Sequence, residues 1–410
     1  MRGEPGAGDA DVVVTGLGTV NALASSVDAF AAALRAGACA IGPVTGFDAS
    51  GYRSRIAAEV KELPPSDRLP PALRRRASRS DRLALAAAAE ALRDSGLDVA
   101  AAPARVGVVL GATTAGMMAA ETSLLARITG TATRYRRSRL VGTPMATSAD
   151  LIAHLFGLGG PRLVLSTACS SSGTALGIAC DWIRLGRVDA VLAGGTESMC
   201  RTIFAGFNAL KALSLEPCRP FDRRRAGLSL GEGAAILVVE SAAHAARRNA
   251  RAHATILGYG LSADAHHLTA PHPEGAGAAL AMTRALARAG VAPADVDYIN
   301  AHGTGTPLND VVEAAAIERV FGEAAARLAV SSTKAAVGHT LGAAGAIEGL
   351  ATVLALRDGF LPPTVNLEEP DPACRLDFVP RASRPAALRC ALSNSYGFGG
   401  NNTTVVFGRA

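Results

Sequence analysis

Short runs of apolar residues that end in glycine or a small polar residue recur along the chain. Three of them are residues 12–16, 106–111 and 190–195. Runs this short predict strands that are buried on both faces. Between them lie alanine-rich stretches, of which residues 80–94 carry apolar side chains at helical spacing. Strands alternating with such helices predict an α/β protein with mainly buried sheets.

The two halves of the chain resemble each other. Residues 163–186 and 328–359 each predict a strand, a turn and a helix dense in alanine and glycine. Each segment is preceded by a strand that runs into a glycine–threonine loop, at residues 106–116 and 296–307. Such pairs also occur by chance in α/β proteins, but two matches in the same order favour a duplication.

The length and composition fit this organisation. The chain has 410 residues, of which 49% are hydrophobic and 19% charged. It is longer than one typical domain and too apolar for an extended disordered chain. We therefore expect an N-terminal half over residues 1–255 and a C-terminal half over residues 256–410, with the division near residues 250–258.

The charge and the cysteines exclude several classes of partner. A net charge of +6 is too small for this length to indicate nucleic-acid binding. A long uncharged stretch, residues 163–180, contains several serines and threonines, so we expect no membrane span. The N-terminal residues lack the apolar region of a signal peptide. Seven scattered cysteines without metal-ligand spacing indicate a reducing, cytoplasmic environment and no bound metal.

One cysteine lies where a catalytic nucleophile is expected. Cys169 stands in Ser-Thr-Ala-Cys-Ser-Ser-Ser-Gly, between a predicted strand and a predicted helix. Unpaired backbone N–H groups and the helix dipole at such a turn favour the thiolate and can stabilise an oxyanion. A buried structural cysteine is the alternative, but it needs no serine- and glycine-rich turn.

Two histidines occupy glycine-rich loops that follow apolar strands. His302 stands in Asn-Ala-His-Gly-Thr-Gly-Thr-Pro, and His339 follows Lys-Ala-Ala-Val-Gly. Both lie near the carboxyl edge of a strand, where open α/β sheets place their sites. Lys334 is one of only three lysines, and we expect it to orient or tune the site. Glu348 lies in an apolar helix, where a carboxylate needs a partner such as this lysine–histidine cluster.

A glycine-rich loop near the C-terminus carries one large apolar side chain. Phe398 stands between glycines in Asn-Ser-Tyr-Gly-Phe-Gly-Gly-Asn-Asn, residues 394–402. The phenylalanine is a candidate movable gate. A tight turn beside the strand at residues 403–407 is the alternative.

These motifs occur in the order that is seen in one enzyme family. The ordered motifs are Thr-Ala-Cys-Ser-Ser (167–171), His-Gly-Thr-Gly-Thr-Pro-Leu-Asn-Asp (302–310), Ser-Thr-Lys-Ala-Ala-Val-Gly-His (332–339) and the loop at 394–402. The chain thus resembles the β-ketoacyl-acyl carrier protein synthases, and most of all the elongating condensing enzymes and the ketosynthases of type II polyketide systems. The resemblance covers residues 12–407. It implies the thiolase fold, with two αβαβα-layered halves around a pseudo-twofold axis, usually in a dimer.

The resemblance also implies roles for the candidate residues. Cys169 would accept an acyl group from a carrier-protein thioester, and the backbone N–H groups of Cys169 and Phe398 would form the oxyanion hole. His302 and His339 would promote the loss of CO₂ from a malonyl thioester. Lys334 and Glu348 would hold the two histidines in place.

The remaining roles concern substrate binding. Thr304 and Thr306 would hydrogen-bond the phosphopantetheine arm of an acyl carrier protein, which carries the substrates, so no tightly bound cofactor is expected. Thr114 and Phe207 would contact the substrate, with Thr114 in the acyl pocket where many fatty-acid enzymes carry Ile.

The second histidine distinguishes subclasses of the fold. Thiolases resemble this family but carry a second cysteine where His339 stands, and initiating synthases carry Asn. Two histidines therefore favour decarboxylative elongation. The chain is then a homodimeric enzyme, or the catalytic half of a heterodimer with a chain-length-factor paralogue. A non-catalytic chain-length partner is the less favoured alternative, because such partners lack the active cysteine.

Two further expectations concern the partner and the product. Acyl carrier proteins are acidic, so arginines at 74–76, 134–139 and 223–225 are candidate contacts. Tyr396 and Asn401 replace the more frequent Phe and Thr of the gating loop, and we expect neither to touch the catalytic groups. Together with Thr114 they make a specialised polyketide or polyene product plausible.

Overall fold

The computed structural model describes residues 11–63, 70–130 and 137–410. The first half contains β1 (Val12–Asn21), α1 (Val27–Arg35), β2 (Gly42–Pro43), β3 (Ile56–Ala58), α2 (Pro71–Arg74), α3 (Arg79–Ser95), β4 (Val106–Gly111), α4 (Met117–Ile128), α5 (Thr147–Phe156), β5 (Arg162–Leu165), α6 (Ser171–Arg184), β6 (Ala190–Glu197), α7 (Arg201–Ala209), β7 (Leu230–Gly231), β8 (Gly233–Ser241) and α8 (Ala242–Arg247).

The second half contains β9 (Ala254–Ala263), α9 (Ala276–Ala289), β10 (Tyr298–Asn300), α10 (Asn309–Phe321), β11 (Ala329–Ser331), α11 (Lys334–Val337), α12 (Ala344–Asp358), β12 (Phe360–Leu361), β13 (Asp377–Phe378), β14 (Arg384–Pro385), β15 (Cys390–Gly397) and β16 (Asn401–Arg409). The strands and helices expected from the apolar runs are present. Helix α8 ends at Arg247, and Asn249 shortly after it adopts a left-handed conformation with φ of 54°.

The strand order repeats in the two halves. The large sheet runs β13-β11-β10-β15-β16-β9-β1-β8-β6-β4-β5. From the centre outward, β1 is antiparallel to β8, β8 is antiparallel to β6, and β6, β4 and β5 are parallel. On the other side, β9 is antiparallel to β16, β16 is antiparallel to β15, and β15, β10 and β11 are parallel. This repeated topology confirms the duplicated fold. The division after residue 255 stays a prediction, and that position lies inside β9.

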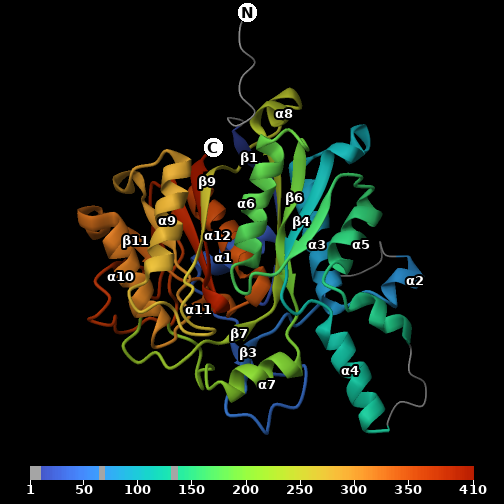
Figure 1. The fold of residues 1–410 in the computed structure, drawn as a ribbon, viewed down its shortest axis with the longest axis horizontal. Coiled ribbons are helices and arrows are strands. Elements are labelled where there is room, and N and C mark those ends of the chain that lie inside the picture. The colour runs from blue at the N-terminus through green and yellow to red at the C-terminus, as the bar shows by residue number, and fades with distance from the viewer. Residues whose placement is uncertain (1–10, 64–69, 131–136) are drawn as a thin grey trace, which may run out of the picture.

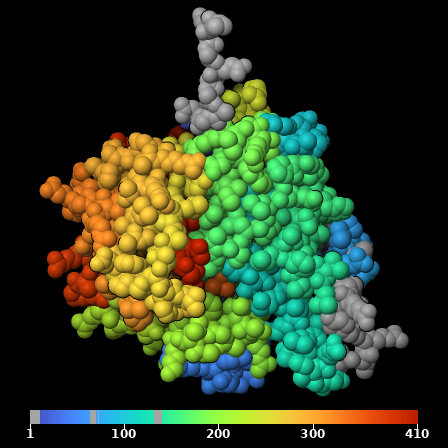
Figure 2. All heavy atoms as spheres, in the orientation of Figure 1, coloured from blue at the N-terminus to red at the C-terminus, as the bar shows by residue number. Residues whose placement is uncertain are grey.

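The helices form layers on both sides of the sheet. Helices α3 and α5 contact the strands of the first half, and α9 contacts those of the second, on the outer faces in Figure 1. Helices α6 and α12 contact each other and strands of both halves, so they form the central layer. Figure 2 shows C-terminal residues, in red, that reach the surface between the yellow and green parts of the two halves. This arrangement is the αβαβα layering that the resemblance implied.

The small side chains of the central helices permit this close packing. Residues 344–356 of α12 are all buried, so this helix has neighbours on every side. At its start, a Cβ added to Gly345 would lie 2.5 Å from the backbone nitrogen of Gly173 in α6. Only glycine permits this approach, which brings the N-termini of the two helices together. The turn that carries Cys169 and the loop that carries His339 precede these two helices.

Among the described residues, no helix combines the length and the apolar character that a bilayer crossing requires.

Candidate active site

The turn that carries Cys169 is fixed by the serines around it. Ala168 has a left-handed conformation with φ of 54°, which turns the chain sharply between β5 and α6. The hydroxyl of Ser170 donates to the carbonyl of Thr167 at 2.8 Å, and that of Ser171 donates to the carbonyl of Ala168. The Thr167 N–H in turn donates to Ser171 Oγ at 2.9 Å. The serines therefore stabilise the strained turn that presents the thiol.

The sequence predicted that the turn at Cys169 favours the thiolate, and this expectation is wrong. Burial raises the pKa of Cys169 to about 11, although the charge of Lys334 and the backbone N–H groups of Phe398 and Cys169 lower it in part. The side chain is 7% exposed, so the loss of hydration outweighs these favourable interactions. Burial therefore favours the neutral thiol over the thiolate.

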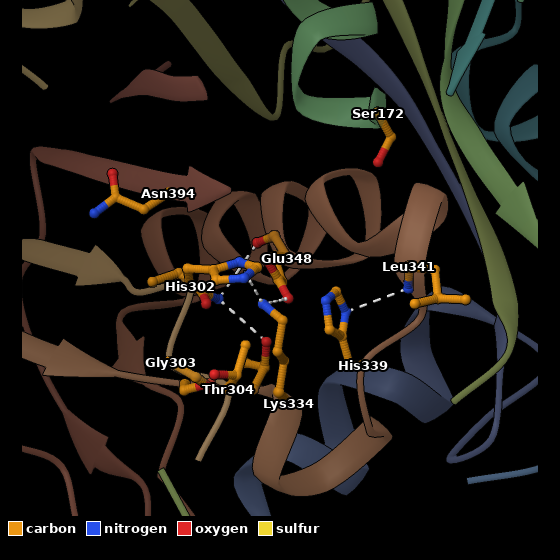
Figure 3. A network of polar contacts seen from close by, with 12 residues as sticks. Ser172, His302, Gly303, Thr304, Lys334, His339, Leu341, Glu348 and Asn394 are labelled. Atoms are coloured by element: carbon orange, nitrogen blue, oxygen red, sulfur yellow. Dashed lines mark hydrogen bonds and ion pairs between the residues drawn. The ribbon is translucent and has the colours of Figure 1, made fainter. Parts of the chain in front are cut away.

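A chain of buried polar contacts leads to His302. The Nζ of Lys334 lies 3.2 Å from Nδ1 of His302 and forms an ion pair with Glu348 (Figure 3). An ammonium group only donates, so Nδ1 of His302 accepts and the ring proton is on Nε2. Lys334 is fully buried, and its pairing with Glu348 is the one expected from the sequence. Burial raises the pKa of Glu348 to about 7, against the lowering effect of the lysine.

His339 lies beside this chain, with its ring fixed by its own loop. The Leu341 N–H donates to Nδ1 of His339 at 3.3 Å, so the ring proton is again on Nε2 (Figure 3). The ring centroids of His302 and His339 are 5.3 Å apart, at 83°. Burial, helped by the nearby Lys334, lowers the pKa of both histidines well below 6.5. The pair thus consists of two neutral N–H donors near neutral pH.

A second buried carboxylate, which the sequence reasoning missed, fixes the backbone of His302. Glu313 in α10 accepts from the N–H groups of His302 and Gly303, each at 2.8 Å. Burial raises the pKa of Glu313 to about 7. The available signal was its spacing: Asp310 and Glu313 are three residues apart on the side of α10 that carries Ala314 and Ile317, and all four are buried.

The loop expected to form a gate connects β15 with β16 and lies against the cysteine turn. The ring of Phe398 stacks on that of Phe207, with centroids 5.9 Å apart and planes at 22°. The Phe398 N–H hydrogen-bonds the Cys169 thiol, which is why it lowers the pKa of that thiol. Gly399 has φ of 80°, and its N–H donates to the carbonyl of Leu268 at 2.8 Å. The loop is therefore both a turn between strands and a wall of the site.

One cavity of about 380 Å³ joins most of the predicted residues. Its lining includes seven of them: Cys169, Phe207, His302, Thr304, Thr306, His339 and Phe398. Lys334 and Glu348 lie behind His302. The hydroxyls of Thr304 and Thr306 are 2.9 Å apart, so they form one polar pair in the wall.

Two residues of the substrate region differ from expectation. Thr114 does not line this cavity, and its hydroxyl donates to the buried carboxylate of Glu197. Its place in an acyl pocket stays a prediction. Tyr396 was expected to avoid the catalytic groups, and this is wrong: its ring centroid is 5.7 Å from that of His302, and it lines the cavity. Tyr396 is next to the end of β15, whose register turns it towards the histidine loop.

The candidate arginines have different surroundings. Arg75 and Arg76 are exposed. Arg223 pairs with Glu369, and Arg225 with Asp371. The stretch at 134–139 lies outside the residues whose side chains the structure describes. Within the described ranges, no group of three or more His, Cys, Asp or Glu side chains is arranged to hold a metal ion.

Comparison with known proteins identifies the family. The chain matches the models described as "Beta-ketoacyl synthase, N-terminal domain" over residues 9–245 and "Beta-ketoacyl synthase, C-terminal domain" over residues 253–368. It is 43% identical to 3-oxoacyl-[acyl-carrier-protein] synthase 2 of Coxiella burnetii, with 97% of this chain and 98% of that protein covered.

Solved structures agree over the whole chain. The ishigamide ketosynthase/chain length factor is similar with a TM-score of 0.92 and 36% identity, covering 98% of this chain and 99% of that one. A type II polyketide ketosynthase (AntDE) in complex with its acyl-carrier protein (AntF) is similar with a TM-score of 0.89 and 32% identity, covering 98% and 100%. With both domain models and a full-length relative matched, this chain belongs to the β-ketoacyl synthase family.

Proposed function

We propose that this protein catalyses the decarboxylative condensation of an enzyme-bound acyl thioester with malonyl-acyl carrier protein, to give β-ketoacyl-acyl carrier protein in fatty acid or polyketide chain elongation. The observation that carries the proposal is the convergence of one thiol and two neutral Nε2–H donors on a single cavity. The thiol is that of Cys169, and the donors are His302 and His339. A nucleophile and a pair of hydrogen-bond donors are what the two half-reactions need.

The first half-reaction transfers the acyl group to Cys169. Its sulfur attacks the thioester carbonyl of the acyl carrier protein, and a tetrahedral oxyanion forms. The N–H groups of Cys169 and Phe398, which already favour negative charge on the sulfur, would stabilise that oxyanion. The C–S bond to the phosphopantetheine breaks, and its thiolate takes the proton that the Cys169 thiol loses.

The second half-reaction forms the carbon–carbon bond. The Nε2–H groups of His302 and His339 donate to the thioester oxygen of the malonyl group, so that the electrons released with CO₂ are held as an enolate. The enolate carbon attacks the acyl carbonyl on Cys169, the C–S bond breaks, and the cysteine thiolate takes a proton from solvent. Both histidines keep their protons throughout.

The donor roles explain the buried groups behind the histidines. Lys334 keeps Nδ1 of His302 as an acceptor, and Glu348 compensates the lysine charge. Thr304 and Thr306 place two hydroxyls in the cavity wall, where they would bind the phosphopantetheine arm. The substrates arrive on this arm, so we propose no tightly bound cofactor.

The partners follow from the same reaction. We propose an acyl carrier protein as substrate donor, recognised in part by exposed arginines such as Arg75 and Arg76. The protein is either a homodimer or the catalytic half of a heterodimer. The heterodimer is supported by its similarity to the ishigamide ketosynthase/chain length factor. Cys169 disfavours a non-catalytic partner role. Seven free cysteines support a cytoplasmic location.

Reconstitution tests the proposal. The purified protein, alone and co-expressed with a neighbouring paralogue, is mixed with the native acyl carrier protein in its acyl- and malonyl-loaded forms. Intact-mass spectrometry should show an acyl adduct on Cys169 and then a β-ketoacyl-carrier protein. Activity only after co-expression identifies the heterodimer. Absence of the adduct and of the product from both preparations contradicts the proposal.

A further inference from the structure

A fully buried carboxylate contacts the segment that carries His339. Glu197 ends β6 and is 0% exposed. Its Oε1 accepts from the N–H and the hydroxyl of Thr114 and from the N–H of Ala115. Its Oε2 accepts from the N–H and the hydroxyl of Thr113 and from the N–H of Gly342. Each oxygen therefore has three donors, of which two are backbone N–H groups.

This carboxylate connects two loops that are far apart in the sequence. The loop at residues 112–115 follows β4, and the segment at 339–342 contains the second histidine. Their backbones touch, because a Cβ on Gly342 would lie 2.7 Å from the backbone nitrogen of Thr113. The Glu197 carboxylate lies where the two loops meet, and the hydrogen bond from Gly342 N–H is 3.1 Å long.

The segment held by Glu197 fixes the ring of His339. The residue before Gly342 is Leu341, whose N–H donates to Nδ1 of His339. Leu341 has φ of 49°, a left-handed conformation that is unfavourable for a residue with a branched side chain. The backbone of His339 is fixed separately, since its N–H donates to the carbonyl of Ser229 at 2.7 Å. The Leu341 bond therefore governs the ring orientation and tautomer, and an anchor at Gly342 keeps Leu341 in its strained conformation.

We propose that Glu197 is a positioning residue for His339, acting through Gly342 and Leu341 to keep Nε2–H aimed into the cavity. The inference rests on the proposed function, in which His339 donates to the malonyl thioester. It predicts that damage at Glu197 impairs the release of CO₂ more than the acylation of Cys169, because the cysteine turn and Phe398 are held by other contacts.

The substitution Glu197→Gln tests this with almost no change in volume. In either orientation of the new amide, its NH₂ group faces two backbone N–H groups, which then lack an acceptor. We expect the release of CO₂ from malonyl-carrier protein to fall about 10- to 100-fold, while acylation of Cys169 stays within about threefold. Thr113→Val removes one hydroxyl donor and should give a smaller loss of the same kind, whereas Thr113→Ser should restore the wild-type ratio of the two rates.

Two controls separate positioning from general damage. Asp81→Asn changes another buried carboxylate, which accepts from the N–H of Ser78 and the hydroxyl of Ser148 and does not contact the site. It should leave the ratio of the two rates unchanged. In ¹⁵N-histidine-labelled protein, the Nδ1 resonance of His339, assigned with His339→Ala, should lose its hydrogen-bonded shift in Glu197→Gln.

The outcomes are distinct. If wild-type protein releases no CO₂ but the Nδ1 resonance changes in Glu197→Gln, the proposed function fails and the positioning role stands. If wild-type protein is active and neither the rate ratio nor the Nδ1 resonance changes, the positioning role is wrong. Should Glu197→Gln be insoluble, the same two readouts in Thr113→Val decide between these outcomes.

Discussion

The Nζ of Lys334 lies 3.2 Å from Nδ1 of His302, in the interior of the protein and beside the carboxylate of Glu348. A cation at this place has two effects on the histidine. It makes Nδ1 an acceptor, and its charge opposes protonation of the ring, as the lowered pKa of His302 shows. The lysine thus keeps His302 a neutral donor at Nε2.

In Lys334→Met, the rate of CO₂ release from malonyl-carrier protein should therefore fall about 100-fold, because His302 is no longer held in one tautomer. The variant should also lose roughly 3 kcal/mol of stability, since Glu348 is left buried without its partner. Lys61→Met is the matched control, because Lys61 is an exposed lysine that also pairs with a glutamate. CO₂ release equal to that of the control, measured at a temperature where both are folded, would contradict the assigned role.

Removal of the nucleophile should separate the two half-reactions. Cys169→Ala should form no acyl adduct and no condensation product, yet it should still release CO₂, because the two histidines are intact. Cys180→Ala changes a buried cysteine of α6 and should keep both activities. Intact-mass spectrometry and a CO₂ assay measure the two steps. Full condensation by Cys169→Ala would falsify the mechanism.

The pH dependence of the thiol follows from its surroundings. With a pKa of about 11, only a small fraction of Cys169 is thiolate at pH 7. The rate of alkylation by iodoacetamide should rise about tenfold per pH unit from pH 7 to pH 10, since the thiolate is the reactive form. Lys334→Met should slow alkylation at each pH, because loss of the positive charge raises this pKa further. Peptide mass spectrometry resolves Cys169 from the exposed Cys39. A plateau reached below pH 9 would show that burial does not control the thiol.

The gating loop packs so closely against the cysteine turn that a side chain at position 397 should not fit. A Cβ on Gly397 would lie 2.8 Å from the carbonyl oxygen of Thr167 and 3.1 Å from the nitrogen of Cys169. Gly397→Ala should push the Phe398 N–H away from the thiol and slow acylation by about tenfold or more. Gly206→Ala is the control, since nothing lies within 4 Å of its Cβ position. Equal acylation rates in the two variants would show that the Phe398 N–H is not part of the oxyanion hole.

The parts of the site that follow strand ends were predictable from sequence. Cys169, His302 and His339 stand in short segments of glycine, serine and threonine after apolar runs, and the carboxyl ends of neighbouring strands meet at one edge of a sheet. The pairing of Lys334 with Glu348 was predictable for a different reason, because a carboxylate in an apolar helix needs a partner. The duplicated strand order followed from the order of similar segments.

The parts that depend on packing between distant segments were not predictable. Glu197 accepts mostly from backbone N–H groups of distant segments, and such donors leave no trace in residue type. For Glu313 the spacing from Asp310 was a signal of a buried helix face, but it did not identify the backbone N–H groups of His302 and Gly303 as the donors. The contact of Tyr396 with His302 depends on how β15 meets the loop after β10. The expected direction of the Cys169 pKa shift was wrong. The effect of a helix start can be expected from the local sequence, whereas the loss of hydration depends on everything that surrounds the side chain.

The close contact of Gly173 with Gly345 joins equivalent positions of the two halves. Each glycine begins one central helix, and each is followed four residues later by another, Gly177 and Gly349. Two identical copies of a single half could make this contact with themselves, as an isologous pair. The seam between the halves therefore has the form of an interface between two shorter chains, which the covalent connection holds at a high effective concentration. The turn before one of these helices carries Cys169, and the loop before the other carries His339.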